Sequence, residues 1–264
     1  LLERLVDRAT RLVTLVGAGG IGKTRLALEV GRQLRPAFPD GVWLVAVTAG
    51  PGGAEAIQIA IGEAAGLGQG ERQLTGEQVL AVLRDRQLLL ILDNCEAALD
   101  ELAFLPAWLR RAPGLTILAT SREPLNFQAE AVVALGGLPG GVGQVGAAEA
   151  LFAARARLAG EDVALWAETL PLIGDICRLV DGSPLAIALA AAWARRRSLP
   201  QIREEIGRSL DFLTSRLRDV DPRHRSMRAV FESSWQALPP AEQRVLAALA
   251  VFPAGFSAAA AGRV

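Results

Sequence analysis

The sequence predicts an α/β protein in which a parallel sheet flanked by helices is followed by a helical region. Over the first 135 residues, short apolar runs alternate with helical patterns, whereas from residue 147 onward only helical patterns occur. The runs are almost continuously apolar, as expected for strands that helices cover on both faces. The five expected strands are Leu12–Val16, Val42–Val47, Leu88–Leu92, Leu115–Ala119 and Ala131–Leu135.

The pattern divides the chain into three expected domains, which cover residues 1–140, 141–218 and 219–264. The glycine-rich, nearly featureless stretch Gly136–Gly146 is typical of a linker and marks the end of the α/β domain. In the α/β domain, Thr75 and Gln78 have the spacing of a capping box. The helices expected in the last two domains are Ala148–Leu158, Leu165–Leu179, Ser226–Ala237 and one from Pro240 onward.

One motif between the first expected strand and the first expected helix predicts a binding site. Residues 17–24 read GAGGIGKT and fit the pattern G-x-x-x-x-G-K-[ST], in which backbone N–H groups surround phosphate oxygens. Lys23 is the only lysine among 28 basic residues, and it would reach the β- and γ-phosphates while Thr24 binds Mg²⁺. The expected phosphate-binding residues are Gly17, Gly19, Gly20, Ile21, Gly22, Lys23, Thr24 and Arg25.

A second candidate group is Asp93, which ends the buried run Leu88–Leu92. The carboxyl ends of strands in an open α/β sheet face the ligand crevice, so Asp93 would hold Mg²⁺ together with Thr24, directly or through water. The alternative is an acid that caps the following helix.

Glu96 and Arg122 complete the candidate catalytic set of Lys23, Asp93, Glu96 and Arg122. Asn94 cannot act as a base, whereas Glu96 could activate water; the alternative is a solvent-facing acid near a helix N-terminus. We therefore expect slow turnover. Arg122 follows the strand Leu115–Ala119 and could reach the γ-phosphate; the alternative is an exposed loop arginine.

Composition excludes several classes of function. A formal net charge of +0 argues against an extended nucleic-acid surface. Cys95 and Cys177 lack C-x-x-C spacing and read as reduced core thiols of a cytoplasmic protein, and a zinc site is not expected because His224 is the only histidine. The apolar run Pro184–Ala194 is too short to span a bilayer, so no membrane partner is expected.

Five strings in the chain resemble a known family. They are GAGGIGKTRLALEV, LLLILDNCE, ILATSREPL, DGSPLAIALAAAW and HRSMRAVFESSWQALPPAEQRVLAALAVFPAGF. In this order they resemble the nucleotide-binding segment of STAND-class P-loop NTPases of the NB-ARC type, in the bacterial regulator branch. The fourth string is similar to the family's GLPL motif, which implies that Pro184 contacts adenine; Ser183 and Pro184 also suit an N-cap and a first helical turn. The fifth implies the beginning of a winged-helix domain.

The chain departs from the family pattern at two places. The hydrophobic-Gly-Arg-Glu element before the first strand is absent, and the late histidine motif would lie beyond Val264, since His224 stands too early. We expect the chain to be a segment of a longer protein and to bind nucleotide more weakly than the parent does.

The resemblance implies a regulatory switch. ADP bound between the sheet and helical domains would hold a closed state, while ATP with Mg²⁺ would favour an open state that self-associates, and the chain would be a weak ATPase at most. Adenine is implied by the family alone, since no guanine-specific N-K-x-D element occurs. The alternatives are a P-loop enzyme such as a small-molecule kinase and a mechanical ATPase of the AAA+ type. The rate of ATP turnover, measured with and without candidate substrates, distinguishes these three classes of function.

DNA binding is expected only through flanking sensor or output domains outside this chain. Arg223, Arg225 and Arg228 cluster after residue 219 and could form a phosphate-contacting face, but no recognition helix can be identified. The resemblance implies that the winged helix packs between domains.

Overall fold

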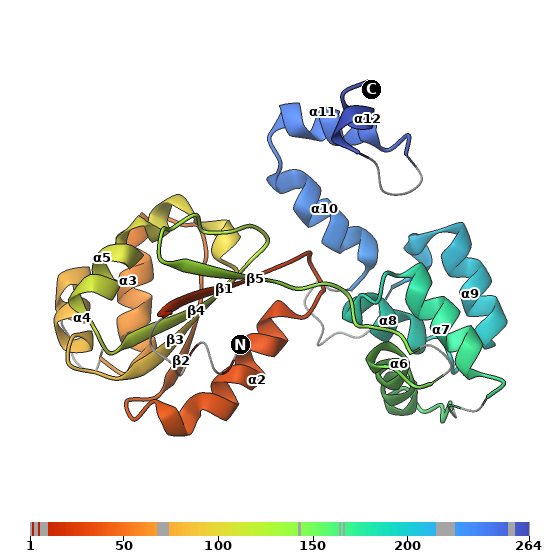
Figure 1. Ribbon diagram of the computed structural model, residues 1–264, viewed down its shortest axis with the longest axis horizontal. Coiled ribbons are helices and arrows are strands. Elements are labelled where there is room, and N and C mark those ends of the chain that lie inside the picture. The colour runs from red at the N-terminus through yellow and green to blue at the C-terminus, as the bar shows by residue number, and fades with distance from the viewer. Residues whose placement is uncertain are drawn as a thin grey trace. The chain divides into compact units, whose positions relative to one another are not determined.

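The computed structural model describes residues 2, 5, 10–67, 74–141, 144–163, 165, 167–214, 225–252 and 257–263. The chain divides into two compact units, Leu1–Gly137 and Leu138–Val264 (Figure 1). In the described part of the chain, no helix is long and apolar enough to cross a membrane.

Unit 1 contains a five-stranded sheet, and all its paired strands are parallel. The strand order is β2-β3-β4-β1-β5, so β4 lies between β3 and β1 (Figure 1). The carboxyl ends of β1, β3 and β4 therefore meet along one edge, and the five predicted strands are confirmed to within two residues. Their bounds are β1 Leu12–Val16, β2 Val42–Ala46, β3 Leu88–Asp93, β4 Leu115–Ser121 and β5 Glu130–Ala134.

Helices cover both faces of this sheet, which explains why the strands are apolar throughout (Figure 1). On one face, Val13 and Ile91 pack in one core with Val30 of helix α2 (Lys23–Leu34). On the other face, Leu90 packs in a core with residues of helices α3 to α5, since successive strand residues point to opposite faces. The remaining elements are α3 Gly53–Ala64, α4 Gly76–Leu83, α5 Leu105–Arg111, η1 Arg35–Ala37, η2 Cys95–Ala97 and η3 Asp100–Phe104.

The capping box predicted before α4 is confirmed. Thr75 Oγ1 accepts a hydrogen bond from Gln78 N at 3.4 Å, and Gln78 Oε1 accepts one from Thr75 N at 2.9 Å. Local signals of this kind satisfy backbone groups at the helix end and set where the helix begins.

Unit 2 is helical, and its core gathers side chains such as Phe152, Ile173, Ile187 and Ile202. The described residues of unit 2 form no strand. An isolated antiparallel β-bridge joins Thr214 to Ser226. The elements are α6 Ala147–Leu158, α7 Leu170–Leu179, α8 Pro184–Ala191, α9 Leu199–Arg208, η4 Leu210–Phe212, α10 Met227–Ala237, α11 Pro240–Leu249 and α12 Ala258–Ala261.

The predicted start of α7 at Leu165 is wrong. The helix begins at Leu170, and Pro171 occupies its first turn. In a helix that started at Leu165, Pro171 would lie in the interior, where it lacks the N–H for the ladder and its ring clashes with the preceding turn. The position of Pro171, and not the apolar periodicity, therefore sets where α7 begins.

Two residues of the glycine-rich stretch after β5, Gly141 and Gly146, are held by hydrogen bonds. Beyond Gly137 this stretch belongs to unit 2, and Glu149 in the first turn of α6 accepts hydrogen bonds from the backbone N–H groups of Gly141 and Gly146. Glu149 is only 2% exposed. A carboxylate in the core of unit 2 thus anchors the chain where it enters this unit.

The segment after residue 225 begins as predicted. Ser226 caps α10 by accepting a hydrogen bond from Ala229 N at 3.0 Å, and Pro240 lies in the first turn of α11. Arg228 forms a bidentate ion pair with Asp211, at 2.7 and 2.5 Å. Arg223 and His224 lie outside the described residues, and the winged-helix assignment stays a prediction.

Candidate functional site

The loop between β1 and α2 has a backbone that only glycine adopts easily. Gly20 and Gly22 have φ values of 77° and 98°, in the left-handed region. At Gly17 a Cβ atom would lie 2.8 Å from the carbonyl oxygen of Leu135, too close for any other residue. Among the described residues, no side chain caps the N-terminus of α2 and its first turn contains no acid. The loop thus presents a helix N-terminus suited to an anion.

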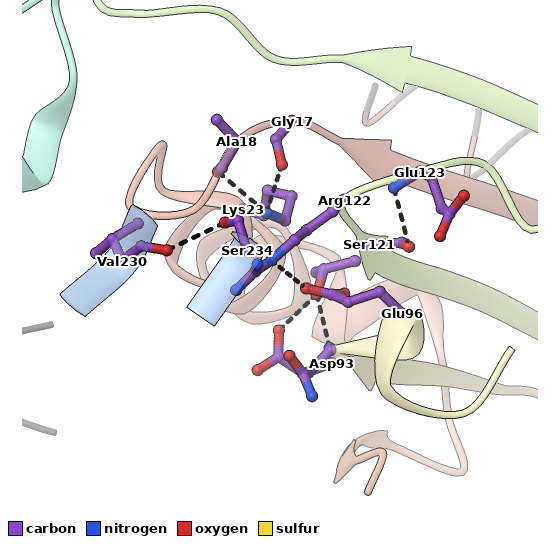
Figure 2. Close-up of polar contacts among 12 residues, drawn as sticks. Gly17, Ala18, Lys23, Asp93, Glu96, Ser121, Arg122, Glu123, Val230 and Ser234 are labelled. Atoms are coloured by element: carbon purple, nitrogen blue, oxygen red, sulfur yellow. Dashed lines mark hydrogen bonds and ion pairs between the residues drawn. The ribbon is translucent and has the colours of Figure 1, made fainter. Parts of the chain in front are cut away.

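Lys23 is the first residue of α2, and its side chain reaches back to the backbone of this loop. Its Nζ donates hydrogen bonds to the carbonyl oxygens of Gly17 at 2.7 Å and Ala18 at 3.2 Å (Figure 2). Burial lowers the pKa of Lys23 below its ordinary value; the nearby carboxylate of Glu96 opposes this shift, the Arg122 guanidinium adds to it, and Asp93 opposes it. The Lys23 ammonium therefore interacts electrostatically with Glu96, Arg122 and Asp93.

Asp93 joins three elements at the edge of the sheet. Its Oδ1 accepts a hydrogen bond from Thr24 Oγ1 at 2.6 Å and another from Thr120 Oγ1 at 2.6 Å. Thr120 also accepts a bond from the backbone N–H of Asn94 at 3.1 Å. The phosphate-loop helix, β3 and β4 are thus tied together through one carboxylate.

Thr120 is a site residue that the sequence did not reveal. It belongs to the run Thr120-Ser121-Arg122, in which the sequence predicts a role for the arginine alone. Position is the signal that could have identified it: a hydroxyl at the end of β4, the strand next to β3, lies where it can reach the carboxylate that ends β3.

Glu96 and Arg122 face one another (Figure 2). Arg122 Nε lies 3.0 Å from Glu96 Oε1, and the side chains are 27% and 16% exposed, respectively. Arg122 is therefore not the exposed loop arginine of the alternative interpretation. Glu96 does lie in the first turn of a short 3₁₀ helix, but its carboxylate points to Arg122 and not to open solvent.

The residues present fit a magnesium ion. Thr24 Oγ1 and Asp93 Oδ1 are both oxygen donors and lie 2.6 Å apart. The described residues contain no group of three or more His, Cys, Asp or Glu side chains that could hold a metal. One carboxylate and one hydroxyl suit Mg²⁺, which keeps several waters and takes its remaining ligands from substrate phosphates.

The other predicted residues have different surroundings. Ile21 is partly buried beside Gly17, and Arg25 is exposed on the first turn of α2. Pro184 belongs to unit 2, where it opens α8 next to Ser183, whose Oγ accepts a hydrogen bond from Ala186 N at 3.5 Å. Capping therefore accounts for Ser183 and Pro184 within unit 2, and adenine contact by Pro184 stays a prediction.

The fold and the site together define the class of unit 1. A parallel sheet with helices on both faces carries a glycine-rich loop between a buried strand and a helix, and Thr24 of this loop bonds to the carboxylate that ends β3. This is a P-loop nucleotide-binding domain. Residues 1–125 match the family model described as NB-ARC domain. The similarity to the NB-ARC family thus lies within unit 1.

Relatives and solved structures extend the comparison. An "Uncharacterized protein" of Mycobacterium tuberculosis (strain ATCC 25618 / H37Rv) is 34% identical over 250 residues, which cover 93% of this chain and 62% of that protein. A "Putative HTH-type transcriptional regulator" of the same strain is 34% identical over 262 residues, covering 95% of this chain and 28% of the regulator. The crystal structure of a Signal Transduction ATPase with Numerous Domains from Pyrococcus horikoshii covers 98% of this chain and 35% of its own, at 17% identity and a TM-score of 0.43.

The predicted resemblance to NB-ARC proteins of the bacterial regulator branch is confirmed by the domain match and by the regulator among the relatives. The chain spans 62% of the first of these relatives and 28% of the regulator.

Proposed function

We propose that this chain is the adenine-nucleotide-binding module of a regulatory switch. ADP holds a closed state, and ATP favours a state that self-associates and signals. The bond between Thr24 and Asp93 carries the proposal, because it joins the phosphate loop to the strand-end carboxylate next to Lys23. The NB-ARC match and the regulator among the relatives support the same function.

Each site residue has a role in this proposal. Lys23 exchanges its bonds with Gly17 and Ala18 for bonds to β- and γ-phosphate oxygens. Thr24 and Asp93 hold Mg²⁺, which when bound neutralises phosphate charge. Pro184 contacts the adenine ring, as the family resemblance implies.

The same geometry favours slow hydrolysis. The residue after Asp93 is Asn94, whose side-chain amide donates to the carbonyl oxygen of Val47 at 3.3 Å and cannot accept a proton from water. The candidate base Glu96 is paired with Arg122. A switch needs this slowness, since each nucleotide state must persist long enough to be read. The nucleotide can shift the equilibrium only by its differential affinity for the two states.

DNA contact by the whole protein would use parts outside this chain. Arg228, one of the arginines of the predicted phosphate-contacting face, is engaged in its bidentate pair with Asp211. The helix-turn-helix named in one relative's description fits an output domain elsewhere in a longer polypeptide.

The test of the proposed function is the nucleotide that the purified chain carries. We expect denaturation followed by chromatography to release ADP at about one equivalent per chain, because a closed ADP state exchanges slowly. Protein without nucleotide that turns over added ATP rapidly would contradict the switch and favour a P-loop enzyme or a mechanical ATPase.

A second prediction concerns the metal. Asp93→Asn keeps the size of the side chain and an acceptor for Thr24 and Thr120 but removes the negative charge. We expect the gain in ATP affinity on adding Mg²⁺ to fall roughly tenfold, whereas affinity in EDTA does not fall. Isothermal titration calorimetry with and without Mg²⁺ measures both.

Asp40→Asn is the matched control for this measurement, since Asp40 accepts a bond from Gln87 N at 2.6 Å and is exposed. This variant should behave as the unmodified chain does. If Mg²⁺ raised the ATP affinity of Asp93→Asn as much as that of the unmodified chain, Asp93 would not be a ligand of the metal.

A further inference from the structure

A groove with a volume of about 700 Å³ lies between the ends of helices α4 and α5 in unit 1. The end of α4 contributes Leu80, Arg84 and Asp85 to its lining, and the end of α5 contributes Arg110, Arg111 and Pro113. We propose that this α4–α5 groove binds an acidic peptide segment of a partner protein, whose carboxylates pair with Arg84 and Arg110.

The α4–α5 groove lies at the opposite edge of the sheet from the nucleotide site. Its lining residues precede β3 and β4, which begin at Leu88 and Leu115. Asp93 and Thr120 of the nucleotide site, in contrast, lie where these parallel strands end. Both helices of the groove pack against the same face of the sheet (Figure 1). Binding in the groove is therefore a separate function from nucleotide binding.

The two walls of the groove are held together by direct contacts. Arg111 donates hydrogen bonds to both carboxylate oxygens of Glu77, at 2.8 and 2.7 Å, and so joins α5 to α4. The turns that follow the two helices also lie close together, since a Cβ atom at Gly114 would lie 2.2 Å from the carbonyl oxygen of Arg86. The groove is thus formed before a ligand binds, which lowers the entropy cost of binding.

Two guanidinium groups in the groove are available to a ligand. Arg84 and Arg110 are exposed, and neither forms an ion pair or a side-chain hydrogen bond with another described residue. The helix macrodipole favours arginine near a helix C-terminus, which explains why each is present but not the groove between them. Because they come from different helices, a segment in the groove meets a cation on each side. Guanidinium groups bind carboxylates through paired hydrogen bonds.

The lining of the groove favours a peptide over a nucleic acid. Asp85 lies on the same rim and Glu77 pairs with Arg111, so a continuous row of phosphates would meet anions as well as cations. Leu80 and Pro113 add apolar atoms that suit a side chain between two carboxylates. The sequence of this chain contains no run of more than two acidic residues, so a partner protein is the expected source of the acidic segment.

The test begins with a random-peptide library displayed on phage. It is selected separately on the unmodified chain and on the double variant Arg84→Gln/Arg110→Gln. We expect the unmodified chain to select peptides enriched in aspartate and glutamate, and the double variant to show no such enrichment, because the complementary charges are gone. Acidic enrichment with both proteins, or with neither, would overturn the proposal.

Fluorescence anisotropy with a selected acidic peptide then measures the contribution of each residue. We expect Arg84→Gln and Arg110→Gln each to weaken binding roughly fivefold, since exposed charge pairs contribute modestly. Asp85→Asn should strengthen binding about twofold, because it removes an anion from the rim, and damage to the fold cannot produce such a gain. Arg35→Gln is the matched control: Arg35 is exposed in η1, outside the groove, and this variant should bind as the unmodified chain does.

Three results would contradict the proposal or separate it from the nucleotide function. Equal weakening by Arg35→Gln would mean general charge attraction. A labelled oligonucleotide that binds more tightly than the peptide, and is weakened by the same two variants, would assign the groove to nucleic acid. Bound ADP should be the same in every groove variant, so acidic-peptide binding by a chain without ADP would end the nucleotide proposal alone. Thermal melting by circular dichroism establishes that each variant is folded.

Discussion

Replacing Lys23 by alanine is expected to weaken binding of both ADP and ATP roughly a hundredfold or more. The Lys23 ammonium lies in the phosphate loop, bonded to Gly17 O and Ala18 O, and would contact two phosphates. Charge-assisted hydrogen bonds contribute about 1.5–3 kcal/mol each, and two of them correspond to a factor of this size. Calorimetry, or ADP released from denatured protein, measures the loss.

Lys23→Arg is the informative companion variant. It keeps a positive charge but substitutes a planar fork for a compact ammonium in a loop closed around its backbone carbonyls. We expect it to bind nucleotide far more weakly than the unmodified chain does. Nucleotide affinity within about threefold of normal in Lys23→Ala would be incompatible with a phosphate-binding loop.

Replacing Glu149 by alanine is expected to destabilise unit 2 by about 2–4 kcal/mol. The Glu149 side chain lies in the core, 2% exposed, and accepts bonds from Gly141 N at 3.2 Å and Gly146 N at 3.0 Å. Without it, these donors lose their carboxylate partner and a cavity replaces its side chain. Hydrogen exchange measured by mass spectrometry reports the two units separately.

We expect faster exchange in residues 138–158 of Glu149→Ala and little change across the strands of unit 1. Glu204→Ala is the control, since this glutamate is exposed on α9 and its ion pair with Arg208 spans 3.6 Å. Its effect should stay within about 0.5 kcal/mol. Equal exchange in Glu149→Ala and the unmodified chain would mean that water satisfies Gly141 and Gly146 when the carboxylate is absent.

Local patterns predicted most of the secondary structure. The strands, the Thr75 capping box and the start of α10 near Ser226 depend on neighbours a few residues away, so the sequence alone contains the signals for them. Apolar periodicity alone places the start of α7 too early, because Pro171 restricts the helix to a start at Leu170. Glu149 was missed for a different reason: nothing in a glycine-rich run indicates that a later carboxylate bonds to its N–H groups.

The class of fold and the phosphate loop can be predicted from the amino-acid sequence, because both follow from short-range spacing of glycines, apolar residues and Lys23. The strand order, and the residues that it brings together, are known only from the three-dimensional structure. Thr24 meets Asp93 across 69 positions, and Thr120 meets the same carboxylate across 27. The Glu96–Arg122 pair likewise depends on β4 lying beside β3. Such contacts arise from the packing of strands distant in sequence, which no local pattern encodes.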